Sequence, residues 1–221
     1  KGMSNNEVVN MLRSGRQTPF KLSFNNQDTL EKFAGRIAAQ VEADSISLLN
    51  SFSDKQFLST NNLTNKSILQ IFIPNTYEFY WTVSPEKFRA KMLDSYKIFW
   101  NKNRLQKAKK LNLTKEEVIT LASIVQKETA QNSERPIVAG LYLNRLRKGW
   151  ALQADPTSIY CVKEKKGQDY VVKRALTVDL EIEAPYNTYK YRGLPPTLIA
   201  MPVIASIDDV LNAEKHNDMY M

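Results

Sequence analysis

A glutamate stands on the apolar face of a predicted helix, where a carboxylate is unusual. Glu128 follows Ile124 by four residues and Val125 by three, so a helix places these side chains on one face. Burial of that face disfavours the charged carboxylate and raises its pKa, so the group could hold a proton for donation near neutral pH. Glu128 is therefore a candidate general acid. The structural alternative is a helix-end glutamate that pairs with Lys127 or Arg135.

A polar run bounded by Gly149 and Gly167 supplies the next candidates. Gln153, Asp155 and Thr157 offer hydrogen-bond donors and acceptors of the kind that the hydroxyl groups of a sugar need. Asp-Pro-Thr is also a common opening of a turn. A sugar-binding segment and a structural turn therefore both fit these residues.

A third group of candidates lies in a loop braced by prolines, between residues 184 and 196. The rings of Tyr186 and Tyr189 could stack on the apolar faces of sugars, while the side chain of Asn187 could hydrogen-bond to amides. The alternative is a rigid loop whose tyrosines simply pack against their neighbours. Composition alone slightly favours the rigid loop.

The composition excludes several other kinds of chemistry. The 221 residues include one cysteine, Cys161, so no internal disulfide, cysteine-based zinc site or iron–sulfur cluster can form. They also include one histidine, His216, and a Ser-His-Asp or Cys-His apparatus would depend on it alone. That residue lies in a polar stretch near the end of the chain. Carboxylates are therefore the expected catalytic groups, and no metal or cofactor is expected.

The chain is strongly basic, with a net charge of +8. This charge favours an anionic partner, such as nucleic acid, anionic lipid or an acidic cell-wall polymer. The basic residues gather at 102–110, 145–148 and 163–166 and do not alternate with aromatic residues as a nucleic-acid surface would require. No nucleic-acid partner is expected.

The sequence contains no stretch that could span a membrane. The strongly apolar stretch at 68–74 falls far short of the roughly 18 residues that a spanning helix needs. Because the chain begins with Lys1-Gly2 rather than with Met or a signal peptide, any targeting segment is expected to lie outside it.

The first third of the chain predicts a small β-α-α-β unit. Alternating apolar and polar residues at 20–24 indicate a half-buried strand, and the β-branched run at 68–73 indicates a second one. Between them, helical spacing covers 30–41 and 46–52. One further short helix is expected within 2–15.

Helices dominate the predicted elements after residue 74. A Ser-Pro pair begins a helix over 84–99, and a capping box begins another over 114–129. A third helix is expected over 133–149, where it ends at a glycine. Beyond it, frequent turn signals predict a small β-rich platform with loops.

Several motifs in the second half of the chain follow one another in a specific order. They are Leu121–Ala130, Glu134-Arg135, Val138–Leu146, Leu152–Thr157, Tyr186–Tyr189 and Gly193–Pro196. Together they closely resemble the endolytic murein transglycosylase family, also called YceG-like. Residues 74–79 resemble the segment by which that family enters its catalytic domain, and the β-α-α-β unit is similar to its LysM-like domain.

This resemblance implies an α+β fold, with a LysM-like domain within residues 1–74 and a C-terminally truncated catalytic domain over 75–221. It implies a lyase that cuts nascent peptidoglycan internally at the MurNAc-β-1,4-GlcNAc bond and leaves 1,6-anhydro-MurNAc ends. The implied partners are peptidoglycan strands, peptidoglycan synthases and the membrane, through an N-terminal anchor outside this sequence. The implied location is the inner membrane, with the catalytic domain on its periplasmic side.

The resemblance also assigns roles to residues. The family's catalytic glutamate directly precedes Thr-Ala, which is Glu128 here, while a second acidic position two residues earlier is Gln126. A single carboxyl group suffices if the substrate's own 6-hydroxyl attacks, because Glu128 could first protonate the departing GlcNAc oxygen and then accept the hydroxyl proton. A non-catalytic peptidoglycan-binding module is the alternative. The expected substrate-binding residues are Asn144, Gln153, Asp155, Thr157, Tyr186, Asn187 and Tyr189.

Overall fold

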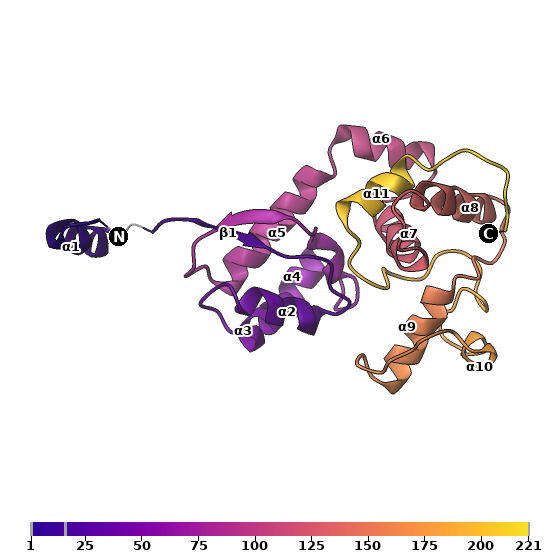
Figure 1. Ribbon diagram of the computed structural model, residues 1–221, viewed down its shortest axis with the longest axis horizontal. Helices are drawn as coiled ribbons and strands as arrows, with labels where there is room; N and C mark the ends of the chain where they lie inside the picture. Colours follow the sequence, from indigo (N-terminus) through magenta and orange to yellow (C-terminus); the bar gives the residue numbers. More distant parts are fainter. Residues whose placement is uncertain (1, 16, 221) are drawn as a thin grey trace.

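The computed structural model describes residues 2–15 and 17–220 and shows an α+β fold in which helices predominate (Figure 1). Its two strands, β1 (Phe20–Ser23) and β2 (Thr76–Phe79), pair antiparallel, with Phe20 opposite Phe79. The helical elements are α1 (Asn5–Arg13), α2 (Leu30–Ala38), α3 (Ser45–Phe52), α4 (Lys55–Thr60), η1 (Ile68–Ile71), α5 (Pro85–Phe99), α6 (Lys102–Lys110), α7 (Lys115–Glu128), α8 (Arg135–Arg147), α9 (Asp155–Lys166), α10 (Thr177–Leu180) and α11 (Ile204–Leu211).

Helix α1 lies apart from the rest of the molecule, at the left of Figure 1. Ser4 begins it with a capping box, and none of its residues is buried. Its apolar residues Val8, Val9 and Leu12 are all exposed. The short helix predicted within 2–15 is therefore confirmed as a helix that contributes nothing to the core.

An aromatic core holds the two-stranded sheet and helices α2, α3 and α5 together. The ring of Phe33 on α2 lies 4.3 Å from Phe72 and 5.8 Å from Phe52 on α3. Phe88 of α5 joins the same cluster and stacks on Phe79 of β2 at 4.9 Å. The predicted order of strand, two helices and strand is present, with α4 and η1 inserted before β2. The LysM-like character of this unit and the division at residue 74 stay predictions.

The strand predicted at 68–73 is wrong, because this run forms the 3-10 helix η1 and the second strand begins at Thr76. All four residues of η1 are buried, and periodicity does not separate a fully buried strand from a fully buried helical turn. Two hydrogen bonds lie just before η1: Ser67 Oγ accepts the Thr64 N–H at 2.8 Å, and Thr64 Oγ1 accepts the Ser67 N–H at 3.1 Å.

Three predicted helices in the second half are confirmed, with small changes at their ends. Ser84 caps α5, and the Thr114–Glu117 capping box begins α7. Helix α8 begins at Arg135, two residues after the predicted start at Ser133. Helices α7 and α8 pack together with long buried segments, and α11 packs against both, so this trio forms the C-terminal core.

The β-rich platform predicted after Gly149 is wrong, since the structure from there to residue 220 contains α9, α10, α11 and loops but no strand. Asp155-Pro156 begins a helix instead of a turn, because proline fits the first turn of a helix. The loop that follows α10 is tied down by its side chains instead of a strand ladder: Thr188 Oγ1 accepts the backbone N–H of Ala154 at 3.0 Å.

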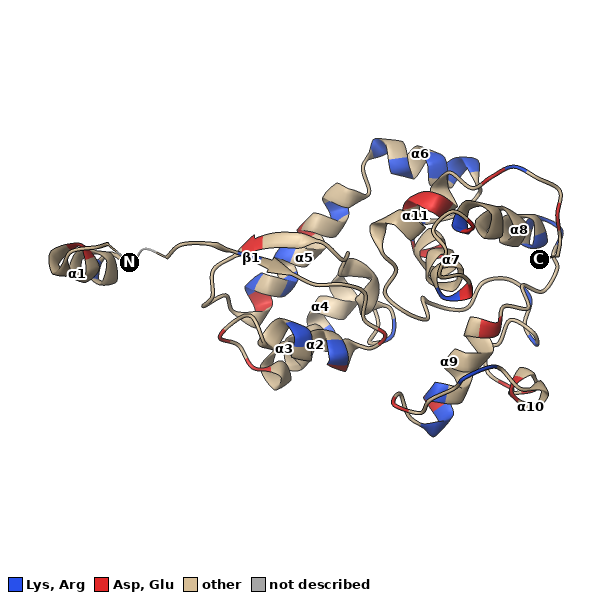
Figure 2. Cartoon of the chain, in the orientation of Figure 1, with Lys and Arg blue, Asp and Glu red and all other residues tan. Residues whose placement is uncertain are grey.

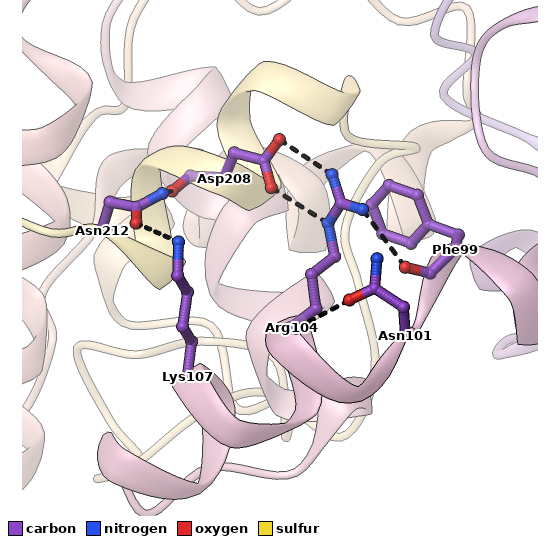
Figure 3. Close-up of polar contacts among 6 residues, drawn as sticks. All are labelled: Phe99, Asn101, Arg104, Lys107, Asp208 and Asn212. Atoms are coloured by element: carbon purple, nitrogen blue, oxygen red, sulfur yellow. Dashed lines mark hydrogen bonds and ion pairs between the residues drawn. The ribbon is translucent and has the colours of Figure 1, made fainter.

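Polar contacts fasten α6 to α11 along the inner side of α6 (Figure 3). Arg104 donates from Nε and Nη2 to the two carboxylate oxygens of Asp208, each at 3.1 Å. Lys107 Nζ donates to Asn212 Oδ1 at 2.6 Å. Helix α6 therefore has one side fixed to the C-terminal core and one side that faces outward.

Across residues 2–15 and 17–220, no helix is long and apolar enough to cross a membrane.

Candidate active site

Glu128 is the last residue of α7, and its carboxylate meets a tyrosine from the neighbouring helix α8. The Tyr142 hydroxyl donates a hydrogen bond to Glu128 Oε2 at 2.8 Å. Tyr142 is fully buried, so its hydroxyl needs a partner inside the protein, and Glu128 is that partner. The packing of α7 on α8 thus fixes the position of the carboxylate.

Burial raises the pKa of the Glu128 carboxyl above its ordinary value, and the nearby charge of Asp155 adds to this effect. The hydrogen bond from Tyr142 and the positive charge of Arg145 act in the opposite direction. The desolvation effect is the largest of the four. The raised pKa expected from the position of Glu128 on the apolar face is therefore confirmed.

The structural alternative for Glu128 is wrong. Lys127 pairs with Asp28 of the N-terminal region, with a distance of 2.7 Å from Nζ to Oδ1. Arg135 makes no ion pair with Glu128 in the part of the chain that the structure describes. Among the described residues, the Glu128 carboxyl is thus a partly buried acid that forms no ion pair.

Asp155 and Tyr189 lie near enough to the Glu128 carboxyl for electrostatic effects between them, although they are 34 residues apart in the chain. Asp155 is the exposed first residue of α9, and the Tyr189 hydroxyl donates to its Oδ1 at 2.5 Å. Burial is the largest effect that raises the pKa of Tyr189, and the hydrogen bond to Asp155 is the next largest. The negative charge of Glu128 raises this pKa further. Gln153, two residues before Asp155, has an exposed side chain. Its backbone is in the left-handed region, with φ at 51°. Of the predicted binding residues, Gln153, Asp155 and Tyr189 therefore offer exposed or partly exposed polar groups.

Thr157 and Asn187 are fully buried and use their polar atoms within the protein. Thr157 Oγ1 lies 2.8 Å from Thr188 Oγ1 and donates to the Ala154 carbonyl at 2.7 Å. Asn187 Nδ2 donates to the carbonyls of Leu180 and Ile182 at 2.9 and 2.8 Å, and its Oδ1 accepts the Tyr189 N–H at 3.1 Å. These two side chains hold the loop that carries Tyr189.

Tyr186 packs against its neighbours, as expected for a rigid loop. Its ring lies 4.7 Å from that of Tyr160, and its hydroxyl is 2.6 Å from Thr197 Oγ1. Lys66 Nζ lies over the same ring at 5.3 Å. Tyr186 lines a cavity of about 900 Å³ between α9 and residues 178–186, while the groups around Glu128 do not line it.

Asn144 and Arg145 of α8 bind the last residues of the chain. Asn144 Nδ2 donates to the carbonyls of His216 and Asp218 at 2.8 and 3.1 Å, and Arg145 Nε donates to the Met219 carbonyl at 2.8 Å. Asn144, a predicted substrate-binding residue, thus holds the C-terminal segment.

Sequence reasoning missed Tyr142 and Arg145 as members of the site. Both lie on a helix that is buried over residues 138–145, and each carries a polar group that must find a partner there. A buried tyrosine between two leucines, on the helix that follows Glu128, was the available signal.

Gln126, at the position where the resemblance leads one to expect a second acidic residue, binds the backbone that leads into α11. Its Oε1 accepts the Val203 N–H at 2.6 Å and its Nε2 donates to the Met201 carbonyl at 3.2 Å. The Ser206 hydroxyl also donates to Oε1, at 3.3 Å. These hydrogen bonds of the Gln126 side chain connect α11 to α7.

The described residues contain no group of three or more His, Cys, Asp or Glu side chains arranged to hold a metal ion. The chemistry available to the site is that of one partly buried carboxyl group with a raised pKa, a buried tyrosine that orients it, and a second carboxylate nearby. Such an arrangement is suited to proton donation.

A sequence model described as the YceG-like family matches residues 1–221. The chain belongs to the YceG-like family. A crystal structure of a yceG-like protein from Listeria monocytogenes has 29% sequence identity and a TM-score of 0.76, and the match covers 99% of this chain and 75% of that one.

Two relatives of this chain carry the name endolytic murein transglycosylase. The protein from Bacillus subtilis is 28% identical over 242 residues, which cover all of this chain and 64% of that protein. The protein from Streptococcus pneumoniae strain D39 is 35% identical over 112 residues, covering 51% of this chain and 20% of that protein. The chain therefore spans less than two thirds of the length of either relative.

Proposed function

We propose that this chain is a peptidoglycan lytic transglycosylase that cuts glycan strands internally and leaves 1,6-anhydro-MurNAc ends. One observation carries the proposal: Glu128 is a partly buried carboxyl group with a raised pKa, oriented by Tyr142 and without an ion-pair partner in the described structure. The names of the relatives from Bacillus subtilis and Streptococcus pneumoniae support the substrate class.

The proposed reaction begins with proton donation. Protonated Glu128 gives its proton to the oxygen of the departing GlcNAc while the bond from that oxygen to C1 of MurNAc breaks. Burial favours the protonated form before the reaction, and the Tyr142 hydrogen bond stabilises the carboxylate that remains.

In the second step, the 6-hydroxyl oxygen of the same MurNAc bonds to C1, and the Glu128 carboxylate takes the hydroxyl proton. No water is consumed, and Glu128 returns to its protonated form. One carboxyl group therefore serves as acid and then as base. This is consistent with the role of Gln126, whose side chain hydrogen-bonds to the backbone before α11. Gln153, Asp155 and Tyr189 are proposed to position the glycan.

We further propose the surroundings in which this reaction takes place. Residues 75–221 act as the catalytic part, on the periplasmic side of the inner membrane and beside peptidoglycan synthases. The N-terminal region of residues 1–74, whose strand β1 pairs with β2 just beyond residue 74, contains a LysM-like domain. The net charge of +8 supports a place next to an anionic surface or polymer.

Incubation of purified peptidoglycan strands with the protein, followed by mass spectrometry, tests the proposal. We expect shorter strands cut at internal positions, with 1,6-anhydro-MurNAc at the new ends. Binding to the strands without any cut would contradict it and favour the peptidoglycan-binding module. Cuts confined to strand ends would contradict the internal mode of cleavage.

Two substitutions are expected to move the alkaline side of the pH–rate profile in opposite directions. The rate falls as pH rises through the pKa of Glu128, because the acid must be protonated before it donates. Tyr142→Phe removes a hydrogen bond that lowers this pKa, so the decline moves to higher pH. Asp155→Asn removes a negative charge that raises this pKa, so the decline moves to lower pH.

Initial rates of strand cleavage across the pH range measure both shifts. Lys163→Gln on the distal half of α9 provides a control, because Lys163 is absent from the groups that shift the pKa of Glu128. Shifts of the two variants in the same direction, or no shift in either, would count against Glu128 as the titrating acid.

A further inference from the structure

The chain around α6 has a concentration of positive charge that the proposed reaction does not use. Residues 97–115 include seven Lys or Arg and no Asp or Glu. In Figure 2, blue Lys and Arg positions recur along the ribbon of α6. Positive charges at this density repel one another, and an anionic partner would offset that repulsion.

Among the described residues, the polar contacts between α6 and the rest of the C-terminal core lie on the inner side of the helix. Arg104 binds Asp208 of α11, and Lys107 binds Asn212, which directly follows that helix (Figure 3). Lys102, Lys109 and Lys110 are exposed and have no side-chain hydrogen bond or ion pair among the described residues. These three lysines are free to meet a partner.

A leucine lies between these lysines on the outward side of the helix. Leu105 is 45% exposed and stands three residues after Lys102 and four before Lys109, so the three side chains share one face. Ile98, in the last turn of α5 just before α6, is 77% exposed. The outward surface of α6 therefore combines lysines with an exposed leucine, and the exposed Ile98 precedes the helix by four residues; we name Ile98, Lys102, Leu105, Lys109 and Lys110 the α6 face.

We propose that the α6 face docks on the surface of an anionic lipid bilayer, with its lysines at the phosphate headgroups and its aliphatic side chains inserted between them. Lysines close to such a surface are each attracted to it, and apolar side chains of an interfacial helix gain from burial at the boundary of the acyl chains. Nucleic acid or an acidic polysaccharide would satisfy the lysines alone and would offer Leu105 and Ile98 no apolar environment.

The position of α6 in the fold suits this orientation. In Figure 1, α6 lies at the upper edge of the C-terminal core, whereas α9, whose first residue is Asp155, lies below α7. Docking through α6 would therefore leave the region around Glu128 uncovered. The inference does not depend on the proposed reaction, since it concerns binding alone.

Cosedimentation of the whole chain with lipid vesicles tests the proposal. We expect binding to vesicles that contain phosphatidylglycerol and little binding to vesicles of phosphatidylcholine alone. The triple variant Lys102→Gln/Lys109→Gln/Lys110→Gln should weaken binding by about a hundredfold. Leu105→Ser should weaken it by about tenfold although it leaves the charge unchanged.

A matched triple variant on another helix separates the α6 face from net charge. Lys163→Gln/Lys165→Gln/Lys166→Gln on α9 removes the same charge and should change binding by less than about threefold. An equal loss in both triple variants would overturn the proposal in favour of a general charge effect. Unchanged binding of Leu105→Ser, with circular dichroism showing intact folding, would overturn insertion into the lipid surface.

Discussion

Glu128→Gln is expected to lower the rate of glycan cleavage by about a thousandfold or more, because a single side chain is proposed to carry both proton transfers. Glutamine has the same shape, and its amide oxygen can still accept the hydrogen bond from Tyr142. It cannot donate a proton to a departing oxygen or take one from a hydroxyl group. The loss should therefore appear in kcat, with little change in the affinity for strands.

The initial rate of release of cleaved strands measures this effect. Glu116→Gln is the matched control, since it makes the same change in the first turn of the same helix, far along α7 from Glu128. It should retain the activity within about twofold, because Glu116 contributes only a weak interaction at the helix N-terminus. A Glu128→Gln rate within about tenfold of the original would show that another group supplies the proton.

Asn187→Ala is expected to lower the free energy of unfolding by about 3–5 kcal/mol, because it removes a fully buried amide from three hydrogen bonds. The carbonyls of Leu180 and Ile182 and the N–H of Tyr189 then lose their partner inside the protein. Tyr189 should also lose its fixed position beside Asp155, so cleavage of strands should weaken with it.

Urea unfolding followed by circular dichroism measures the loss of stability. Asn103→Ala, on the exposed side of α6, makes the same change of residue type and should alter stability by less than about 0.5 kcal/mol. If Asn187→Ala unfolded within about 1 kcal/mol of the original protein while strand binding fell sharply, Asn187 would be a ligand of the glycan instead of a support of the loop.

Local patterns in the sequence predicted the helices and the environment of Glu128. The capping box at Thr114 fixed the start of α7, and the spacing from Ile124 and Val125 placed Glu128 against apolar neighbours. Both features depend on residues within a few positions of one another, so the chain itself displays them. The raised pKa of Glu128 followed from the same spacing.

Features that depend on residues distant in the chain were not predictable in this way. The hydrogen bond between Tyr189 and Asp155 joins residues 34 positions apart, and the partner of Tyr142 depends on how α8 packs against α7. Thr157 and Asn187 have the side chains that a sugar site needs, and only burial shows that those groups are already satisfied. The fully buried run at 68–71 gave no period from which to distinguish a strand from a helical turn.

Cleavage of peptidoglycan strands in water labelled with heavy oxygen is the most direct test of the central claim, that Glu128 works alone and the substrate's 6-hydroxyl attacks. We expect new strand ends that contain no labelled oxygen and are lighter than reducing ends by one water. Incorporation of the label at the new ends would contradict the account. It would show that water attacks and that a second carboxylate, with Asp155 the first to examine, activates it.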